Sequence, residues 1–291
     1  MSLQLFYQLL VSGVVIGSTY ALLGVSFGVI YSTTRTFHLA HSVVYALAAY
    51  GAVVGVRSLD LPLAIAALLG LAVAVITGLV IEFIAYKPMR ARDATVLAVF
   101  LVSLGLTIAA PNLLEIVFGP ENRALPGFPI ETIQVGTVTF TTLDVTSVIV
   151  SWLAIAGVLA FLARTKYGRA VNATRTNPQM AMAVGVPVQQ VYLIVFAIGS
   201  VLAGIAALLF TMGGVANPTM GLTPVLIGFI AVFLGGIGST LGAAFGGLAL
   251  GLAMSLSGLW LTGDFALAVV FGFMFVLLII RPQGLLGKAT V

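Results

Sequence analysis

Two short polar interruptions separate long apolar stretches of the sequence, and their side chains suit hydrogen bonding to a small solute. The first, residues 37–42, contains His38 and His41, and the second, residues 216–221, contains Asn217. Imidazole and amide groups both donate and accept hydrogen bonds. Neither interruption holds a Lys, Arg, Asp or Glu. The pattern therefore favours a small polar or zwitterionic molecule over one that is held by a formal counter-charge.

The two histidines could also be part of a metal site. Zinc sites take three or four protein ligands, and no third ligand of matching type lies near His38 and His41 in the sequence. We therefore expect these histidines to form hydrogen bonds, and we expect no metal.

The two interruptions each follow a glycine-rich apolar segment, one in each half of the chain. Matched breaks of this kind are typical of internally repeated transporters, whose broken helices expose backbone groups to the solute. Ordinary loop ends give the same pattern, and the sequence leaves both interpretations open.

Catalytic motifs are missing from the sequence. A P-loop needs Ser or Thr after its Gly-Lys pair, whereas Ala289 follows Gly287-Lys288. No Ser-His-Asp set or carboxylate pair lies within an apolar segment, and the chain has no cysteine. Glu82 lies near Lys87 at a segment end and could pair with it, which leaves no acid relay for a proton-coupled carrier. We expect a protein that is not an enzyme and that holds no cofactor.

The segments that must position these groups are long and apolar. Hydrophobic residues make up 61% of the chain, the mean hydropathy is +1.22 and only 7% of residues are charged. A helix needs about 20 apolar residues to cross a bilayer. The predicted spans are 5–31, 40–56, 61–85, 94–118, 147–163, 190–212, 224–238, 240–260 and 265–281. We predict an all-α membrane bundle of eight or nine transmembrane helices, in which 224–238 is short for a full crossing.

The charged residues orient this bundle. Ten of the 12 Lys and Arg residues fall in alternate gaps between the spans. They are Arg35, Lys87, Arg90, Arg92, Arg164, Lys166, Arg169, Arg175, Arg281 and Lys288. The other gaps hold Arg57 and Arg123 with most of the acids, Asp264 among them. The positive-inside rule places the first set in the cytoplasm, with the N-terminus outside and the C-terminus inside. Basic residues at membrane ends give no reason to expect nucleic-acid binding.

Glycines spaced by four residues predict close helix contacts, because they leave one helix face without side chains. These glycines are Gly13/Gly17, Gly24/Gly28, Gly238/Gly242/Gly246 and Gly247/Gly251.

Two loops are long enough to carry structure of their own. Residues 119–146 form the predicted external loop, and alternating Thr, Val and Ile from 132 to 142 indicate a hairpin. This loop either caps the external opening of the solute path or serves only as a linker.

Residues 164–190 form the cytoplasmic loop, where Asn177, Pro178 and Gly185 predict a helix of about two turns. So short a helix is stable only when it docks, either on the protein's own surface or on a partner subunit.

Seven stretches in order carry a resemblance to a known family. They are Gly-Ser-Thr-Tyr-Ala-Leu at 17–22, Phe-x-x-Ala-His at 37–41, Glu-x-x-Ala-Tyr-Lys-Pro at 82–88, Gly-Arg-Ala at 168–170, Asn-Pro-x-x-Gly at 217–221, Leu-Gly-Gly-Ile-Gly-Ser at 234–239 and Arg-Pro-x-Gly-Leu-Leu-Gly at 281–287. Along nearly its whole length the chain resembles the permease subunits of branched-chain amino-acid ABC importers.

The resemblance implies one permease domain over 1–291 and a place in a prokaryotic plasma (inner) membrane. It implies a second permease subunit, two cytoplasmic ABC ATPase subunits that bind the ATP, and an external solute-binding protein. It also implies that 168–185 is the segment that couples to an ATPase. The coupling candidates are Tyr167, Gly168, Arg169, Ala170, Asn177, Met180, Met182 and Gly185.

Some positions depart from the family pattern. His38 stands where an Asn is expected, Ser42 replaces a Gly, Val43 replaces an acid, and Ile227 replaces a common Lys. These changes bear on the solute, so an importer of urea or short amides is the alternative to one of branched-chain amino acids. A stand-alone carrier or channel is a second alternative. The candidate path residues are Thr19, Tyr20, His38, His41, Ser42, Tyr45, Ser103 and Asn217.

Overall fold

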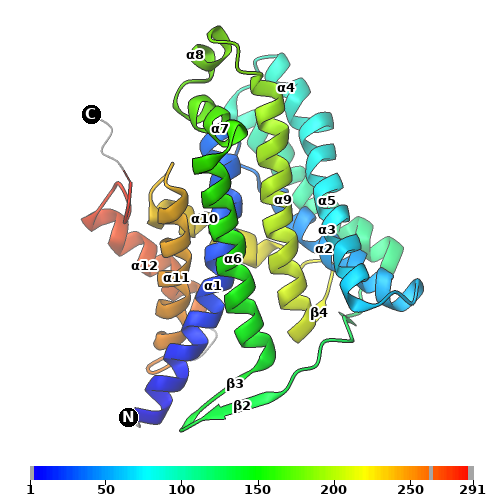
Figure 1. Cartoon of the computed structure of the whole chain (residues 1–291), viewed down its shortest axis with the longest axis vertical. Coiled ribbons are helices and arrows are strands. Elements are labelled where there is room, and N and C mark those ends of the chain that lie inside the picture. Colours follow the sequence, from blue (N-terminus) through cyan, green and yellow to red (C-terminus); the bar gives the residue numbers. More distant parts are fainter. Residues whose placement is uncertain (1–2, 262–264, 288–291) are drawn as a thin grey trace. The chain divides into compact units, whose positions relative to one another are not determined.

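The computed structural model describes residues 3–261 and 265–287, and it is mostly helical (Figure 1). Asp264 and Lys288, two of the charges used to orient the chain, lie outside the described residues. The helices are α1 (Leu3–Thr34), α2 (His41–Ser58), α3 (Leu63–Ile81), α4 (Lys87–Ala91), α5 (Val96–Phe118), α6 (Thr142–Arg164), α7 (Lys166–Thr176), α8 (Pro178–Ala183), α9 (Val188–Gly213), α10 (Leu222–Gly235), α11 (Thr240–Ser257) and α12 (Ala266–Ile280). A π-helical turn, η1 (Glu82–Tyr86), joins α3 to α4.

Each predicted span overlaps one of these helices, so the prediction of a mainly helical bundle is confirmed, while the number of eight or nine membrane crossings stays a prediction. Among the described residues, six helices are long and apolar enough to cross a membrane, with α3 to α4 counted as one. Helix α10 has 14 residues. At 1.5 Å per residue it covers about 21 Å of a hydrocarbon core that is about 30 Å thick. The predicted shortness of 224–238 is therefore confirmed.

The chain divides into two compact units. The first contains Met1–Gly28, Pro129–Ala156 and Ile227–Val291, and the second contains Val29–Phe128 and Gly157–Leu226. Helices α1, α6 and α10 each contribute residues to both units.

Close backbone contacts build the first unit. A Cβ added at Gly251 would collide with the backbone of Gly17, and one added at Gly247 would collide with Ala21, so α1 and α11 are in direct contact. Gly246 approaches α10 in the same way. Buried side chains of α10, α11 and α12 fill the remaining core of this unit. The predicted packing role is confirmed for these glycines, as expected where helices associate in lipid.

Gly238 is an exception, and its predicted packing role is wrong. Its φ is +92°, and nothing lies within 4 Å of the place where a Cβ would be. Gly236, with a φ of +100°, lies in the same turn between α10 and α11. Left-handed backbone of this kind favours glycine, so Gly238 serves the turn.

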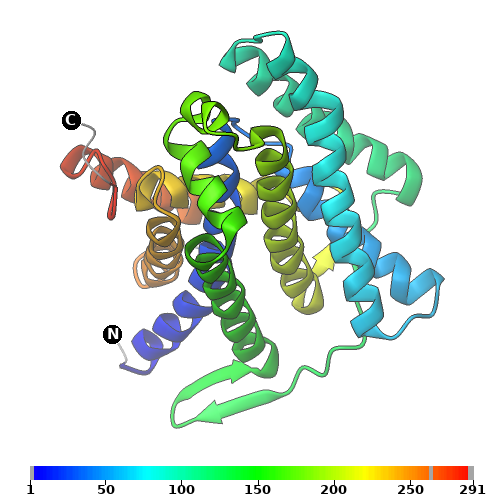
Figure 2. The same cartoon turned by 45° about the horizontal axis from the view of Figure 1, so that its top comes forward.

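The hairpin predicted in 119–146 is present in the first unit. Strands β2 (Thr132–Val135) and β3 (Val138–Thr141) pair antiparallel, and Figure 2 shows the hairpin leading directly into α6. Helix α6 begins at Thr142, within the predicted external loop, and the bounds 119–146 of that loop stay a prediction. The backbone amide and the hydroxyl of Thr141 both donate to the Asp144 carboxylate. The backbone amide of Asp144 donates to the Thr141 hydroxyl in return, at 3.1 Å. This reciprocal cap starts the helix early.

Helices α2, α3 and α9 form the core of the second unit. A Cβ at Gly70 of α3 would meet the Ala48 carbonyl at 2.6 Å, and one at Gly204 of α9 would meet Ala74 at 3.1 Å, so small residues again bring the helices together. Strand β1 (Arg123–Ala124) pairs with β4 (Val215–Ala216) and ties the start of the external segment to the end of α9. The sequence did not predict this pairing.

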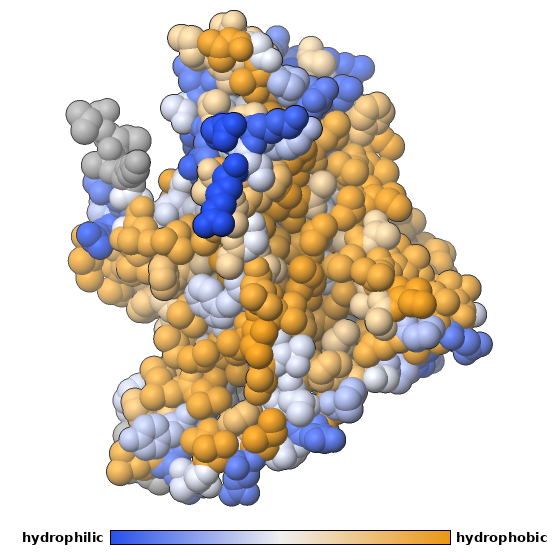
Figure 3. Space-filling view, viewed as in Figure 1, coloured by the Kyte–Doolittle hydropathy of each residue, from blue (hydrophilic) through white to orange (hydrophobic). Residues whose placement is uncertain are grey.

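Basic residues in the second unit gather at the ends that the sequence predicts. Helices α4, α7 and α8 lie at one end of the unit, where Figure 3 shows hydrophilic residues gathered, and β4 lies at the other (Figure 1). Arg57, assigned to the opposite side, donates to the Ala124 carbonyl at 3.1 Å, beside β4.

Between the two ends, α3 and α5 expose large apolar side chains such as Ile116, which is 80% exposed. A surface of this kind suits lipid.

Candidate solute pocket and coupling segment

The two polar interruptions lie against each other in the second unit, although about 180 residues separate them. Residues 35–40 are not helical and lead into α2, and residues 217–221 lead from β4 into α10. A Cβ added at Gly221 would collide with the carbonyl of Ser42. Glycine is needed here because the backbones approach so closely. The predicted relation of the two breaks by an internal repeat stays a prediction.

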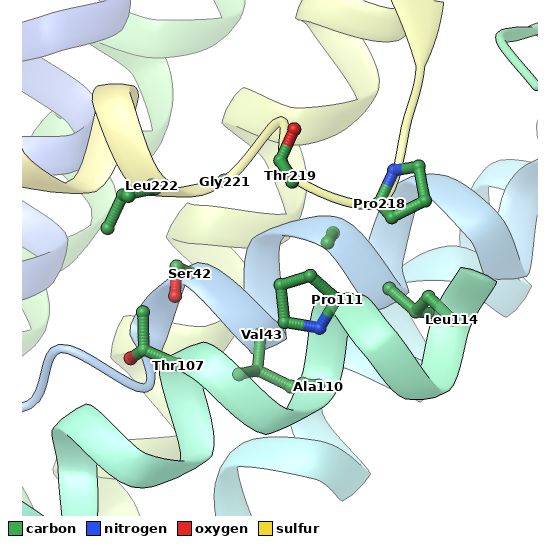
Figure 4. A pocket seen from close by; sticks show the side chains of 11 residues that line it. Ser42, Val43, Thr107, Ala110, Pro111, Leu114, Pro218, Thr219, Gly221 and Leu222 are labelled. Atoms are coloured by element: carbon green, nitrogen blue, oxygen red, sulfur yellow. The ribbon is translucent and has the colours of Figure 1, made fainter. Parts of the chain in front are cut away.

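A small pocket lies where the interruptions meet α5 (Figure 4). Its volume is about 50 Å³. It is lined by Ser42, Val43, Ala46, Thr107, Ala110, Pro111, Leu114, Pro218, Thr219, Gly221 and Leu222. Figure 4 shows the 218–222 segment passing across α2 and α5. Such a space holds a few water molecules, whereas pockets for small ligands are typically about 300–1000 Å³. The pocket must therefore widen before a solute can enter.

Pro111 gives the α5 wall an interrupted backbone. It lies inside the helix, and a proline there has no N–H to donate to the carbonyl four residues earlier, which is that of Thr107. The Thr107 carbonyl therefore lacks its usual α-helical donor four residues on, and the Thr107 hydroxyl separately donates to the Ser103 carbonyl at 2.9 Å. Among the lining residues there is no charged side chain, so the pocket suits a solute without net charge.

A fully buried hydrogen-bond network lies behind the pocket. Nδ1 of His38 is 2.8 Å from the Tyr86 hydroxyl, which donates to Oγ of Ser103 at 2.9 Å. The Ala40 amide donates to the same Ser103 oxygen at 2.9 Å. The Tyr86 hydroxyl therefore links the His38 ring to Ser103. The network fixes the entry into α2 against α5.

The structure brings together only part of the predicted path set. Ser42 lines the pocket, and His38 and Ser103 belong to the network behind it. The His41 ring is buried with its centre 5.1 Å from that of His38. The Tyr45 hydroxyl donates to the Ala206 carbonyl at 3.4 Å.

Three predicted path residues lie elsewhere. The side chain of Asn217 accepts from the amide and the hydroxyl of Thr219, both at 3.1 Å, and it is not among the residues that line the pocket. It therefore shapes its own loop, as Asn commonly does in turns. Thr19 and Tyr20 belong to the first unit, where the Tyr20 hydroxyl is 3.5 Å from the Met254 sulfur.

Sequence reasoning missed Tyr86, Thr107 and Pro111. A proline inside an apolar span is a visible signal of an interrupted helix, and it would have indicated Pro111 together with Thr107. Tyr86 gives no such signal, because its position depends on the π-helical turn that it ends.

Among the described residues, no group of three His, Cys, Asp or Glu is placed to hold a metal ion.

Glu82 pairs with a residue other than the expected one. Its carboxylate forms an ion pair with Arg90, not with Lys87. The Lys87 amine lies 4.5 Å from the centre of the Phe83 ring. Side chains three or four residues apart face each other on an α-helix, whereas Glu82 and Lys87 are five apart. Arg90 lies eight residues after Glu82, with the π-helical turn between them. The Arg90 guanidinium also covers the Tyr192 ring of α9 at 4.5 Å.

Segment 164–190, predicted to be cytoplasmic, contains two short helices, α7 and α8. The cap predictions for α8 are confirmed: Oδ1 of Asn177 accepts from the Met180 amide at 3.0 Å, Pro178 is the first helical residue, and Gly185 has a φ of +86°. Helix α7 was not predicted. It buries Gly168, Val171 and Thr174, which lie on one helical face.

The coupling candidates differ in exposure. Gly168 packs so closely on Phe161 and Leu162 that an added Cβ would collide with them, and Ala170 is half-buried. Tyr167, Arg169, Asn177 and Gly185 are exposed, and Met180 and Met182 are 62% and 55% exposed. Burial, and then the charge of nearby Arg35, lower the pKa of the Arg175 guanidinium beside them. Arginine nevertheless remains charged.

Comparisons with known proteins agree along the chain. A family described as the permease component of the branched-chain amino acid transport system matches residues 9–280. The high-affinity branched-chain amino acid transport permease LivH of Escherichia coli K12 is 31% identical over 98% of this chain and 97% of its own. BraD of Pseudomonas aeruginosa, which carries the same description, is 29% identical over the same shares. The solved structure of PsaBC from Streptococcus pneumoniae with Fab has a TM-score of 0.54 at 15% identity, covers 96% of this chain and 92% of its own, and shows a shared fold.

Proposed function

Because the chain belongs to the permease family of the branched-chain amino acid transport system, we propose that it is the transmembrane permease subunit of an ATP-driven importer. Its solute is a branched-chain amino acid. The observation that carries this proposal is the family match over nearly the whole chain. The pocket at the two interruptions supports it, since irregular backbone at membrane depth is tolerated only where protein buries it or a cavity adjoins it.

In this proposal the whole chain, 1–291, is one permease domain in a prokaryotic plasma membrane. It pairs with a second permease subunit and receives solute from an external binding protein. Two cytoplasmic ATPase subunits bind the ATP, and the permease itself holds no cofactor and catalyses no reaction. The solute path contains the pocket residue Ser42, with His38, His41 and Ser103 behind it.

The exposed apolar surface of the cytoplasmic segment supports coupling to an ATPase. Outside any predicted span, α8 and the residue after it expose Met180, Met182 and, at 72%, Val184. Ala181 lies between the two methionines and is buried. Methionine is common at adaptable binding surfaces, so this side of α8 suits a groove on a partner subunit.

Reconstitution tests the proposed function. We expect vesicles that contain this chain, a second permease subunit and the ATPases to accumulate labelled leucine, isoleucine or valine only with ATP and the external binding protein. Labelled urea is the matched solute control, and uptake of urea in place of the amino acids would support the amide alternative. Accumulation by this chain alone would show a stand-alone carrier and contradict the importer.

The proposed topology has eight or nine transmembrane helices, an outside N-terminus and a cytoplasmic C-terminus. The chain has no cysteine, so single cysteines report sidedness without background. We expect Ala173→Cys on α7 to react only with reagents that reach the cytoplasm, and Glu121→Cys to react from outside intact cells; both residues are exposed. Labelling of Ala173→Cys by an impermeant reagent in intact cells would reverse the orientation.

A further inference from the structure

A continuous series of buried and half-buried contacts leads away from the pocket wall. It starts at Ser103, which lies one helical turn before Thr107 of the wall and accepts hydrogen bonds from Tyr86 and from the Ala40 amide. Ala40 is the N-cap of α2, two residues before Ser42. His38 completes the network through the Tyr86 hydroxyl. Tyr86 therefore holds two walls of the pocket, α5 and the start of α2, in one arrangement.

The series continues from Tyr86 towards the coupling segment. Tyr86 is the last residue of the π-helical turn η1, and Glu82, the first, is paired with Arg90. Arg90 covers the ring of Tyr192, in the second turn of α9. Phe196, one turn further along α9, lies 5.1 Å from the His38 ring and 5.7 Å from the Tyr86 ring, centre to centre. Helix α9 begins at Val188, shortly after α8 ends at Ala183.

The π-helical turn differs in hydrogen-bond register from the α-helices before and after it. A π-helix bonds residue i to i+5, whereas an α-helix bonds i to i+4. Conversion of η1 to α-helix would shift the register by one residue and rotate Tyr86 by about 100°, the angle between successive α-helical residues. The hydroxyl would then leave both His38 and Ser103. Coupling between distant sites needs such a two-state element.

We propose that the π-helical turn 82–86, with Tyr86 as its positioning residue, relays movement of the coupling segment to the solute pocket. The inference rests on the proposed function, because it assumes that α7 and α8 move when ATPase subunits act on them. Movement of α9 reaches η1 through Tyr192 and the Arg90–Glu82 pair. The state of η1 then decides whether Tyr86 holds the pocket walls together or releases them.

Tyr86→Phe tests the relay, because it removes one hydroxyl and keeps the ring. We measure solute accumulated per ATP hydrolysed in vesicles that hold the complete importer, at equal amounts of assembled complex. We expect the ratio to fall at least about fivefold, the lower end of typical coupling between sites, while ATP hydrolysis continues. Tyr50→Phe is the matched control: Tyr50 is buried in the same unit, and its hydroxyl has no hydrogen-bond partner among the described residues. We expect Tyr50→Phe to leave the solute accumulated per ATP hydrolysed unchanged.

A second variant separates relay from simple stabilisation. Ser103→Ala removes the same hydrogen bond and also the one from the Ala40 amide, while Tyr86→Phe also removes the one to His38. Because one bond is shared, the double variant should lose less coupling than the sum of the two single changes. A purely structural network would instead lower the thermal midpoint and the amount of complex and leave the ratio intact, and that result would overturn the relay. If the unaltered complex shows no ATP-dependent accumulation, the proposed function fails. If it accumulates solute and Tyr86→Phe keeps the ratio, only the relay fails.

Discussion

Replacing Gly221 with alanine is expected to abolish uptake by the complete importer. The added Cβ would collide with the backbone carbonyl of Ser42, and a backbone atom at the start of α2 cannot rotate away as a side chain can. The 217–221 segment must therefore shift, which deforms a pocket of about 50 Å³. Overpacking of this kind typically costs about 1–3 kcal/mol of stability. Uptake in vesicles, together with thermal unfolding of the purified protein, measures both effects.

Gly105→Ala provides the matched control for this change. Gly105 lies in α5 of the same unit, and nothing is found within 4 Å of the place its Cβ would take. We expect normal uptake and an unchanged or slightly raised thermal midpoint, since alanine favours a helix over glycine. Normal uptake by Gly221→Ala at an ordinary thermal midpoint would show that the contact of the two interruptions does not shape the path.

Arg169→Glu is expected to lower uptake at least about tenfold while ATP hydrolysis continues. Arg169 is exposed on α7, so the change should leave the folded permease within about 0.5 kcal/mol of its original stability. At a subunit interface, however, a like-charge contact costs several kcal/mol, and the α7–α8 surface is the proposed ATPase contact. The measurement is uptake per ATP hydrolysed, with the amount of permease in the membrane determined by immunoblot.

Arg92→Glu makes the same charge reversal at another exposed position, next to α4. Both residues were assigned to the same side of the membrane by the charge pattern. We expect Arg92→Glu to keep its uptake, which would separate a specific contact from a general effect of charge on membrane insertion. Equal uptake by the Arg169→Glu variant and the unaltered chain would remove α7 from the proposed ATPase contact.

Local signals in the sequence predicted most of the long helices and one of the two short helices in segment 164–190. Runs of apolar residues predict spans because lipid leaves a helix as the simplest way to satisfy the backbone. The α8 caps depend on three side chains close in sequence, Asn177, Pro178 and Gly185, so they too could be predicted. Helix α7 was missed because its charged residues resemble a solvated loop and only its buried face, with Gly168 and Val171, indicates a helix.

The site depended on contacts between residues far apart in the sequence. Nothing near Gly221 indicates that it packs on Ser42, and nothing near Arg123 indicates that its strand pairs with Ala216. The prediction for Glu82 chose the nearest basic residue in the sequence, whereas the observed partner, Arg90, lies eight residues on and beyond the π-helical turn. Polar residue type alone suggested Asn217, whereas the structure shows that its side chain bonds to Thr219 in the same loop.

The narrowness of the pocket bears on how the cell membrane keeps its voltage. An ion that entered a space of about 50 Å³ lined without charged side chains would lose most of its hydration and gain no counter-ion. Each elementary charge that leaks across 100 mV dissipates about 2.3 kcal/mol. If the pocket lies on the proposed solute path, a permease closed at this point adds no electrical leak to the membrane that holds it, however many copies are present.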